Sequence, residues 1–279
     1  MYKRQALTGP LEHHITADIA IASWNYYCVT QDREWLRREG FPLMREAARF
    51  WCDRVTANAD GSYSIRNVIG ANEYAVGVTD NAFTNGAACR ALEDASAAAE
   101  LCGERPDPQW SAVAAGLRIP HFADGTTREH AGYDGEMIKQ ADANLLGYPL
   151  GIVTGREAQL RDLEYYERRI DPRNGPAMSY SVFAIQYARL GMAEKACEMF
   201  RRSYLPNLRP PFGVFAETAT SGNPYFMTGA GGMLQAVLFG FGGLEITADG
   251  LVQRPSVLPP QWKNLRIKIN GKIYQATNQ

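Results

Sequence analysis

Apolar residues recur at helical spacing through the first 240 residues of this chain, and this pattern constrains its fold more than any other feature. In residues 34–54, one face carries Leu36, Leu43, Ala47 and Phe50, behind Asp32 as a typical N-cap. The pattern predicts helices over Ile15–Val29, Glu34–Arg54, Asn81–Leu101, Asp107–Leu117, Arg156–Glu167, Met178–Leu190, Ala193–Tyr204 and Phe226–Phe239. We therefore expect a mainly α fold built from antiparallel helix pairs.

After Gly240 the pattern changes to the alternation of β-strands. Leu244–Thr247 and Leu265–Ile269 alternate apolar and polar residues, and Asn270-Gly271 is a strong hairpin signal before Lys272–Ala276. We expect two domains, a helical one over 1–240 and the start of a small C-terminal β-sheet over 241–279. So small a sheet is marginal alone and must pack on the helices.

Composition excludes several classes of protein. Hydrophobic residues make up 46% of the chain, charged residues 21%, and the formal net charge is −1, so we expect neither a nucleic-acid partner nor a membrane partner. No apolar run is long enough to span a bilayer. The first residues lack the apolar core of a signal peptide, so the location is either cytoplasmic or, where the true N-terminus is absent, unassigned.

Cysteine and histidine spacing gives no metal or disulfide signal. The five cysteines form no CxxC pair, and the four histidines have no HExxH spacing. We expect buried free thiols, no metal and no cofactor.

One carboxylate stands in a long loop over 67–79, in the stretch VIGANEYA. Glu73 is either an exposed loop glutamate, which is the common case, or a proton donor. For the second case, Ile69, Tyr74 and Val76 are expected to form an apolar wall that raises its pKa. Asp80 is expected to cap the alanine-rich helix that follows.

A second isolated carboxylate, Glu217, stands in the aromatic stretch FGVFAET at the end of a long loop over 205–225. From spacing alone it is an exposed acid, the partner of an arginine, or a catalytic group. The next helix starts with Gly229, Gly231 and Gly232, each of which costs about 1 kcal/mol relative to alanine. Close packing or close approach of a ligand would explain them.

Lys139 and Gln140 offer a cation and an amide side by side in IKQAD. They read either as the solvated start of a helix or as ligands of sugar hydroxyls, for which both side chains are suited. Farther on, Ser179–Ser181 open a helix and either cap it or bind an anion at its free N–H groups.

Taken in order, these segments resemble glycoside hydrolase family 65, a family of α-glucoside hydrolases and disaccharide phosphorylases. The matching pieces are HHITADIA with WNYY, GSYSIRNVIGANEY with TDNAFTN, IKQAD, GPAMSYSVFAI and FAETATSGNPYFMTGAGGMLQAVLFGFGGLEI, over about residues 12 to 270. The resemblance implies an incomplete (α/α)6 barrel, or toroid, with a short C-terminal β appendage. The family's N-terminal β-sandwich and first barrel helices have no counterpart here, and Met1–Gln5 matches no part of the pattern.

The resemblance also implies roles for the isolated residues. Glu73 corresponds to the general acid, Glu217 to the general base of the hydrolytic members, and Lys139 with Gln140 to the pair that holds the sugar at the cleavage subsite. Three positions around the acid depart from the family's pattern. Ala71 and Asn72 stand where the family has Pro and Asp, and Ala75 stands where it has His.

The expected function is therefore inverting hydrolysis of a small α-glucoside, a disaccharide or a glucosyl-galactosyl conjugate, by two carboxylates about 6.5–9.5 Å apart. Alternatives are a phosphorylase that releases glucose 1-phosphate, with phosphate held partly by Ser179–Ser181, and a catalytically inactive truncated fragment or helical binding domain. The expected partners are the α-glucoside and the missing N-terminal half of the same protein. A homodimer is left open for the complete protein. An incomplete barrel should also expose an apolar seam.

Overall fold

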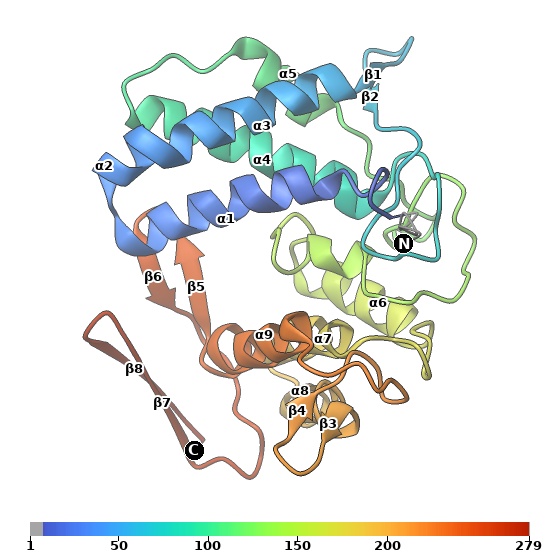
Figure 1. Cartoon of the computed structure of the whole chain (residues 1–279), viewed down its shortest axis with the longest axis vertical. Coiled ribbons are helices and arrows are strands. Elements are labelled where there is room, and N and C mark those ends of the chain that lie inside the picture. The colour runs from blue at the N-terminus through green and yellow to red at the C-terminus, as the bar shows by residue number, and fades with distance from the viewer. Residues whose placement is uncertain (1–7, 279) are drawn as a thin grey trace, which may run out of the picture. The chain divides into compact units, whose positions relative to one another are not determined.

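The computed structural model describes residues 8–278 of the chain, so Met1–Gln5 lies outside the described residues (Figure 1). The chain forms two compact units. The first contains the chain up to Gly135 together with Ile246–Gly250, and the second contains Glu136–Glu245 together with the chain from Leu251 onward. None of the described helices is long and apolar enough to cross a membrane.

Helices dominate the first unit. They are α1 (His14–Thr30), α2 (Arg33–Trp35), α3 (Phe41–Arg54), α4 (Ala82–Leu101) and α5 (Pro108–Gly116). The alanine-rich α4 packs against α1, α3 and α5, as Figure 1 shows, because its small buried side chains let the neighbouring backbones approach closely. The predicted bounds of α1, α4 and α5 are thus confirmed to within a residue.

The predicted helix over residues 34–54 is interrupted. Asp32 caps it as expected, its Oδ1 accepting the N–H of Trp35 at 2.9 Å. A π-helical turn at Leu36–Gly40 then separates α2 from α3. The reason lies in Pro42, which has no N–H to donate into the regular ladder, so the backbone widens just before it.

The N-cap of α4 is Asn81 and not Asp80, which corrects the sequence prediction. Asn81 Oδ1 accepts the N–H of Thr84 at 2.8 Å and its hydroxyl at 2.7 Å. Asp80 adopts a left-handed backbone conformation, with φ of 52°. Its carboxylate instead accepts Ser64 Oγ at 3.0 Å and the N–H of Ile65 at 3.2 Å.

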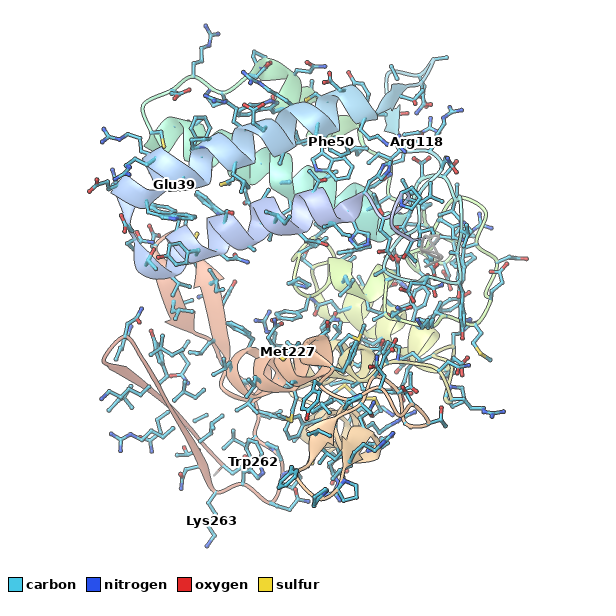
Figure 2. All side chains as sticks on the ribbon, in the orientation of Figure 1. Glu39, Phe50, Arg118, Met227, Trp262 and Lys263 are labelled. Carbon is cyan, nitrogen blue, oxygen red and sulfur yellow. The ribbon has the colours of Figure 1, made fainter. Side chains whose placement is uncertain are left out.

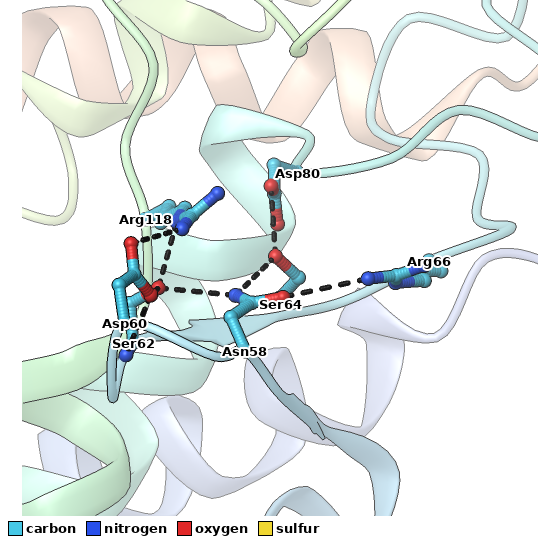
Figure 3. A network of polar contacts seen from close by, with 7 residues as sticks. All are labelled: Asn58, Asp60, Ser62, Ser64, Arg66, Asp80 and Arg118. Atoms are coloured by element: carbon cyan, nitrogen blue, oxygen red, sulfur yellow. Dashed lines mark hydrogen bonds and ion pairs between the residues drawn. The ribbon is translucent and has the colours of Figure 1, made fainter.

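That contact belongs to a polar network around the short hairpin of β1 (Thr56–Ala57) and β2 (Tyr63–Ser64) (Figure 3). Asn58 Nδ2 donates to Ser62 Oγ at 3.0 Å and to Ser64 Oγ at 2.9 Å. At the exposed end of the network, Arg118 Nη2 donates to Asp60 Oδ2 at 2.6 Å. The network therefore links an exposed ion pair to the buried residue Asp80 at the end of the 67–79 loop.

The second unit contains α6 (Arg156–Glu167), α7 (Ala177–Arg189), α8 (Ala193–Arg202) and α9 (Met227–Gln235), followed by a π-helical segment at Ala236–Phe241. It also contains short 3-10 turns at Ala143–Leu146 and Leu205–Asn207 and the hairpin of β3 (Leu208–Arg209) and β4 (Val214–Phe215). A tight turn at Gly191, where φ is 79°, joins α7 to α8.

Close packing on α7 explains two of the three glycines of α9, and also Gly240. A Cβ on Gly229 would lie 3.0 Å from Ala177 Cβ, and one on Gly232 would lie 3.0 Å from Ser181 Oγ. Gly240 approaches Ile185 in the same way, with 3.1 Å to its Cα. Gly231 is different, since nothing lies within 4 Å of the Cβ it lacks.

The C-terminal strands form two separate hairpins. β5 (Leu244–Thr247) pairs with β6 (Gly250–Gln253), a strand that the sequence analysis missed, and β7 (Asn264–Ile269) pairs with β8 (Lys272–Thr277). Leu244, Ile267 and Tyr274 bury one face of them against Leu238 and Phe239 of the helical part. These strands pack against helices, as expected because so small a sheet is marginal alone.

The segment before β7 is fixed by aromatic packing. Trp262, labelled in Figure 2, meets Phe200 and Phe241 edge-on, with ring centroids 5.9 and 5.4 Å apart. The fold is thus mainly helical with few short strands, while the closed or open geometry of a barrel stays a prediction.

Candidate active site

Glu73 lies half-buried in a turn of the first unit, inside the loop over 67–79. The base of this loop is closed by an antiparallel bridge, in which Val68 and Val78 exchange hydrogen bonds of 3.1 and 2.9 Å. Ile69 is fully buried, and its N–H donates to the carbonyl of Leu11 at 3.0 Å. The loop that carries Glu73 therefore has a fixed base.

The apolar wall predicted around Glu73 is mostly wrong. Ile69 is buried, but Tyr74 is 47% exposed and Val76 52% exposed. The side chain that turns inward next to the acid is the amide of Asn72, which is 2% exposed. Polar contacts therefore fix this turn, and apolar contacts of Tyr74 and Val76 do not.

Asn72 is held by a residue that sequence reasoning missed. Its Nδ2 donates to Oε1 of Glu129 at 2.9 Å, and the Glu129 side chain is completely buried. The only available signal was the length of the loop over 119–135, which exceeds the usual connection. A single acid within such a loop carries no pattern of its own.

Lys139, Gln140 and Glu217 all belong to the second unit. Lys139 Nζ lies 3.8 Å from Glu217 Oε1, with side chains 21% and 31% exposed. Gln140 beside it is 8% exposed. The two isolated segments IKQAD and FAET are therefore brought together, and the partner of Glu217 is a lysine where the sequence suggested an arginine.

Backbone contacts hold both segments at the start of α7. The N–H of Ala141 donates to Ser179 Oγ at 3.0 Å, and the N–H of Ala177 donates to the carbonyl of Glu217 at 3.2 Å. Asn207, 3% exposed, adds a bond of 3.0 Å from its Nδ2 to the Glu217 carbonyl. Lys139 and Glu217 are thus positioned from one rigid helix end.

The serines of α7 do not cap it. Pro176 occupies the N-cap position, where no side chain accepts a backbone N–H. Ser179 instead binds the IKQAD segment, and Ser181 Oγ is buried without a hydrogen-bond partner among the described residues. The capping interpretation of Ser179–Ser181 is therefore wrong.

Glu73 belongs to the first unit, and its distance from Glu217 stays a prediction. Within residues 8–278, no group of three histidine, cysteine or acidic side chains could hold a metal ion. The cysteines are free thiols, but only Cys28 is fully buried, where burial raises its pKa to about 12. The other four are half-buried, unlike the expectation.

Comparison with known proteins gives a family match for the first part of the chain. Residues 2–133 match the model of the glycosyl hydrolase family 65 central catalytic domain. The match begins at Tyr2, so most of Met1–Gln5 lies within it, contrary to the expectation from the sequence.

Relatives extend the similarity to nearly the whole chain. A kojibiose hydrolase from Mucilaginibacter mallensis is 50% identical over 262 residues, covering 94% of this chain and 39% of that protein. A protein-glucosylgalactosylhydroxylysine glucosidase from Dictyostelium discoideum is 40% identical over 280 residues, covering 98% of this chain and 39% of that protein. The chain thus spans 39% of the length of either relative.

A solved structure shares the fold. It is a protein from the human microbiome proposed to be a kojibiose phosphorylase, with a TM-score of 0.71 and 18% identity over 93% of this chain and 44% of that one. At this identity the likeness concerns the fold alone.

Proposed function

Because this chain is a partial region of glycoside hydrolase family 65, we propose that the protein to which it belongs hydrolyses the α-glucosidic bond of a small disaccharide or glucosyl conjugate with inversion. The observation that carries the proposal is the ion pair of Lys139 and Glu217 at the start of α7. It joins a cation suited to sugar hydroxyls to a carboxylate suited to activate water. The names of the similar proteins, a kojibiose hydrolase and a glucosylgalactosylhydroxylysine glucosidase, support an α-glucoside as substrate.

In this mechanism Glu73 enters protonated and Glu217 ionised. Glu73 donates its proton to the glycosidic oxygen as the bond from that oxygen to the anomeric carbon breaks. A water attacks the anomeric carbon from the opposite face and loses its proton to Glu217, so the product is the β-anomer of glucose. The two carboxyl groups of an inverting pair stand about 6.5–9.5 Å apart, which leaves room for this water.

Lys139 and Gln140 bind the glucosyl ring in this proposal. Both offer N–H donors to hydroxyls, and the Gln140 amide also accepts a hydrogen bond, so the ring is held in one orientation. Correct placement of the anomeric carbon between acid and water accounts for much of the rate enhancement of such enzymes.

The test uses the complete protein with kojibiose and a panel of other α-glucosides, and NMR reads the first anomer of glucose released. We expect β-glucose from the wild type and a loss of at least about 10³-fold in kcat for Glu73→Gln and for Glu217→Gln. Glu245→Gln, a partly exposed acid of the second unit paired with Arg254, is the matched control.

Three outcomes would contradict the proposal. Release of α-glucose excludes inversion, and near wild-type activity in either variant removes that residue from the mechanism. Formation of glucose 1-phosphate that depends on added phosphate assigns the protein to the phosphorylases instead.

A further inference from the structure

The turn that carries Glu73 is anchored to a buried carboxylate, and we propose that Glu129 is a positioning residue for Glu73, acting through Asn72. This inference rests on the proposed role of Glu73 as general acid. Glu129 itself is completely buried and 57 residues away in sequence from the residue it holds.

Asn72 fixes the backbone on both sides of Glu73. Its side-chain Oδ1 accepts the N–H of Tyr74 at 3.3 Å, and its main-chain carbonyl accepts the N–H of Ala75 at 3.1 Å. The first bond is an Asx-turn, the local motif by which asparagine orders a loop. Glu73 lies in the middle of both turns, so the direction of its side chain follows from the position of Asn72.

Glu129 holds Asn72 in place. The remaining part of the Asn72 amide, Nδ2, donates to Glu129 Oε1 at 2.9 Å, and the two side chains are 2% and 0% exposed. Water cannot replace this bond readily at such burial. Loss of either partner would remove this hydrogen bond from a buried polar group, which is costly.

Glu129 is in turn attached to the rigid part of the first unit. Its carbonyl accepts the N–H of Ala82 at 2.7 Å and Asn81 Nδ2 at 3.2 Å, both at the start of α4. Two residues after Glu129, the N–H of Ala131 donates to the carbonyl of Thr79 at 3.0 Å, and Thr79 ends the loop that carries Glu73. A continuous set of contacts therefore runs from α4 through Glu129 and Asn72 to Glu73.

The chemistry of the pair is specific. An amide donates to a carboxylate, whereas an aspartate at position 72 would place a second carboxyl group against Glu129, and one of the two would have to hold a proton. The pair therefore requires a donor at 72 and an acceptor at 129. A glutamine at 129 still offers an acceptor oxygen, and an alanine offers none.

The first experiment measures kcat and KM of the complete protein on kojibiose for Glu129→Ala, Asn72→Ala, the double variant and Glu129→Gln. We expect each alanine variant to lose about 10- to 100-fold in kcat, since a small misplacement of a catalytic group costs up to this much, with KM changed by less than about threefold. The double variant should be no worse than the single ones, because the residues act as one unit. Glu129→Gln should retain kcat to within about threefold.

Glu100→Ala, an exposed acid on α4, is the control and should retain wild-type kinetics. Wild-type kcat in Glu129→Ala or Asn72→Ala, a rise in KM alone, or additive losses in the double variant would each overturn the inference.

A second readout does not depend on catalysis. Hydrogen exchange of the Tyr74 N–H should be faster in Asn72→Ala and Glu129→Ala, while the amides of α4 keep their protection. If the wild type hydrolyses no glucoside, the proposed function fails, and this exchange rate still decides whether Glu129 holds the turn. Unchanged exchange at Tyr74 would show that it does not.

Discussion

Lys139 Nζ and Glu217 Oε1 are 3.8 Å apart, and both side chains are about one-fifth to one-third exposed. The separation is that of an ion pair and exceeds the roughly 2.7–2.9 Å of a charge-assisted hydrogen bond. The lysine thus lies within electrostatic reach of the proposed base without a direct hydrogen bond to that carboxylate oxygen. This geometry suits a cation that binds a sugar hydroxyl beside the base.

Removing that cation should weaken catalysis. We expect Lys139→Met to lower kcat/KM by about 10- to 100-fold, which corresponds to the loss of a hydrogen bond that involves a charged group. Steady-state kinetics on kojibiose with the complete protein measures the change, and Lys268→Met, an exposed lysine on β7, is the control. Equal kcat/KM in the two variants would exclude Lys139 from the site.

Neighbouring glycines of α9 should respond oppositely to the same substitution. Gly232→Ala would bring a Cβ to 3.0 Å from Ser181 Oγ and 3.1 Å from Ser181 Cβ, so we expect the free energy of unfolding to fall by about 1–3 kcal/mol. Gly231→Ala meets nothing within 4 Å and should raise it by about 0.5–1 kcal/mol through helix propensity. Urea unfolding compares the two, and a change of the same sign in both would contradict the close packing of α9 on α7.

Local patterns sufficed to predict most helices, because apolar periodicity and caps are properties of neighbouring residues. They failed where tertiary contacts decide. Asp80 and Asn81 are both good N-caps, and only the contacts of Asp80 with Ser64 and Ile65 leave the cap to Asn81. β6 was missed because Gly250–Gln253 is short and forms a strand only against β5.

The site was harder to predict than the fold. Spacing alone left Lys139 and Glu217 as separate candidates, and their pairing follows from two long loops that meet at α7. For Glu129 the sequence offered only a long loop and no residue pattern, since its partner Asn72 is 57 residues away and a lone acid gives no pattern.

Asp94 on α4 should make stability depend on pH. The carboxyl is 4% exposed, its Oδ2 has no hydrogen-bond partner among residues 8–278, and burial raises its pKa to about 7 despite the attraction of Arg90. Below the unfolded-state pKa of about 3.9 both states hold the proton. Between there and pH 7 only the folded state holds it, so the free energy of unfolding falls as the pH rises, by at most about 1.4 kcal/mol per pH unit.

Replacing this carboxyl by an amide should remove the slope. We expect Asp94→Asn to flatten the decline between pH 4 and 7 and to be more stable than the wild type above pH 7. Urea unfolding at pH 5, 6, 7 and 8 measures this, with Glu100→Gln, an exposed acid on α4, as control. An unchanged slope in Asp94→Asn would show that another group titrates.

One face of α1 should drive self-association of this chain when it is expressed alone. Ile15, Ile19 and Tyr26 are 46%, 51% and 49% exposed and follow helical spacing, while Ala17, Ala20 and Tyr27 are buried on the other side. A helix that is apolar all round is normally covered all round, and exposed apolar faces of this kind mark interaction surfaces.

Charge on that face should suppress the association. We expect the wild-type chain to form concentration-dependent oligomers in sedimentation velocity, and Ile15→Lys combined with Ile19→Lys to sediment as a monomer, because lysine side chains on the face stay hydrated and repel each other. Ala112→Lys with Ala115→Lys adds the same charge on exposed positions of α5 and should leave the association unchanged. A wild-type chain that stays monodisperse at every concentration would mean that this face is not an association surface, and loss of oligomers in both double variants would point to net charge and not to α1.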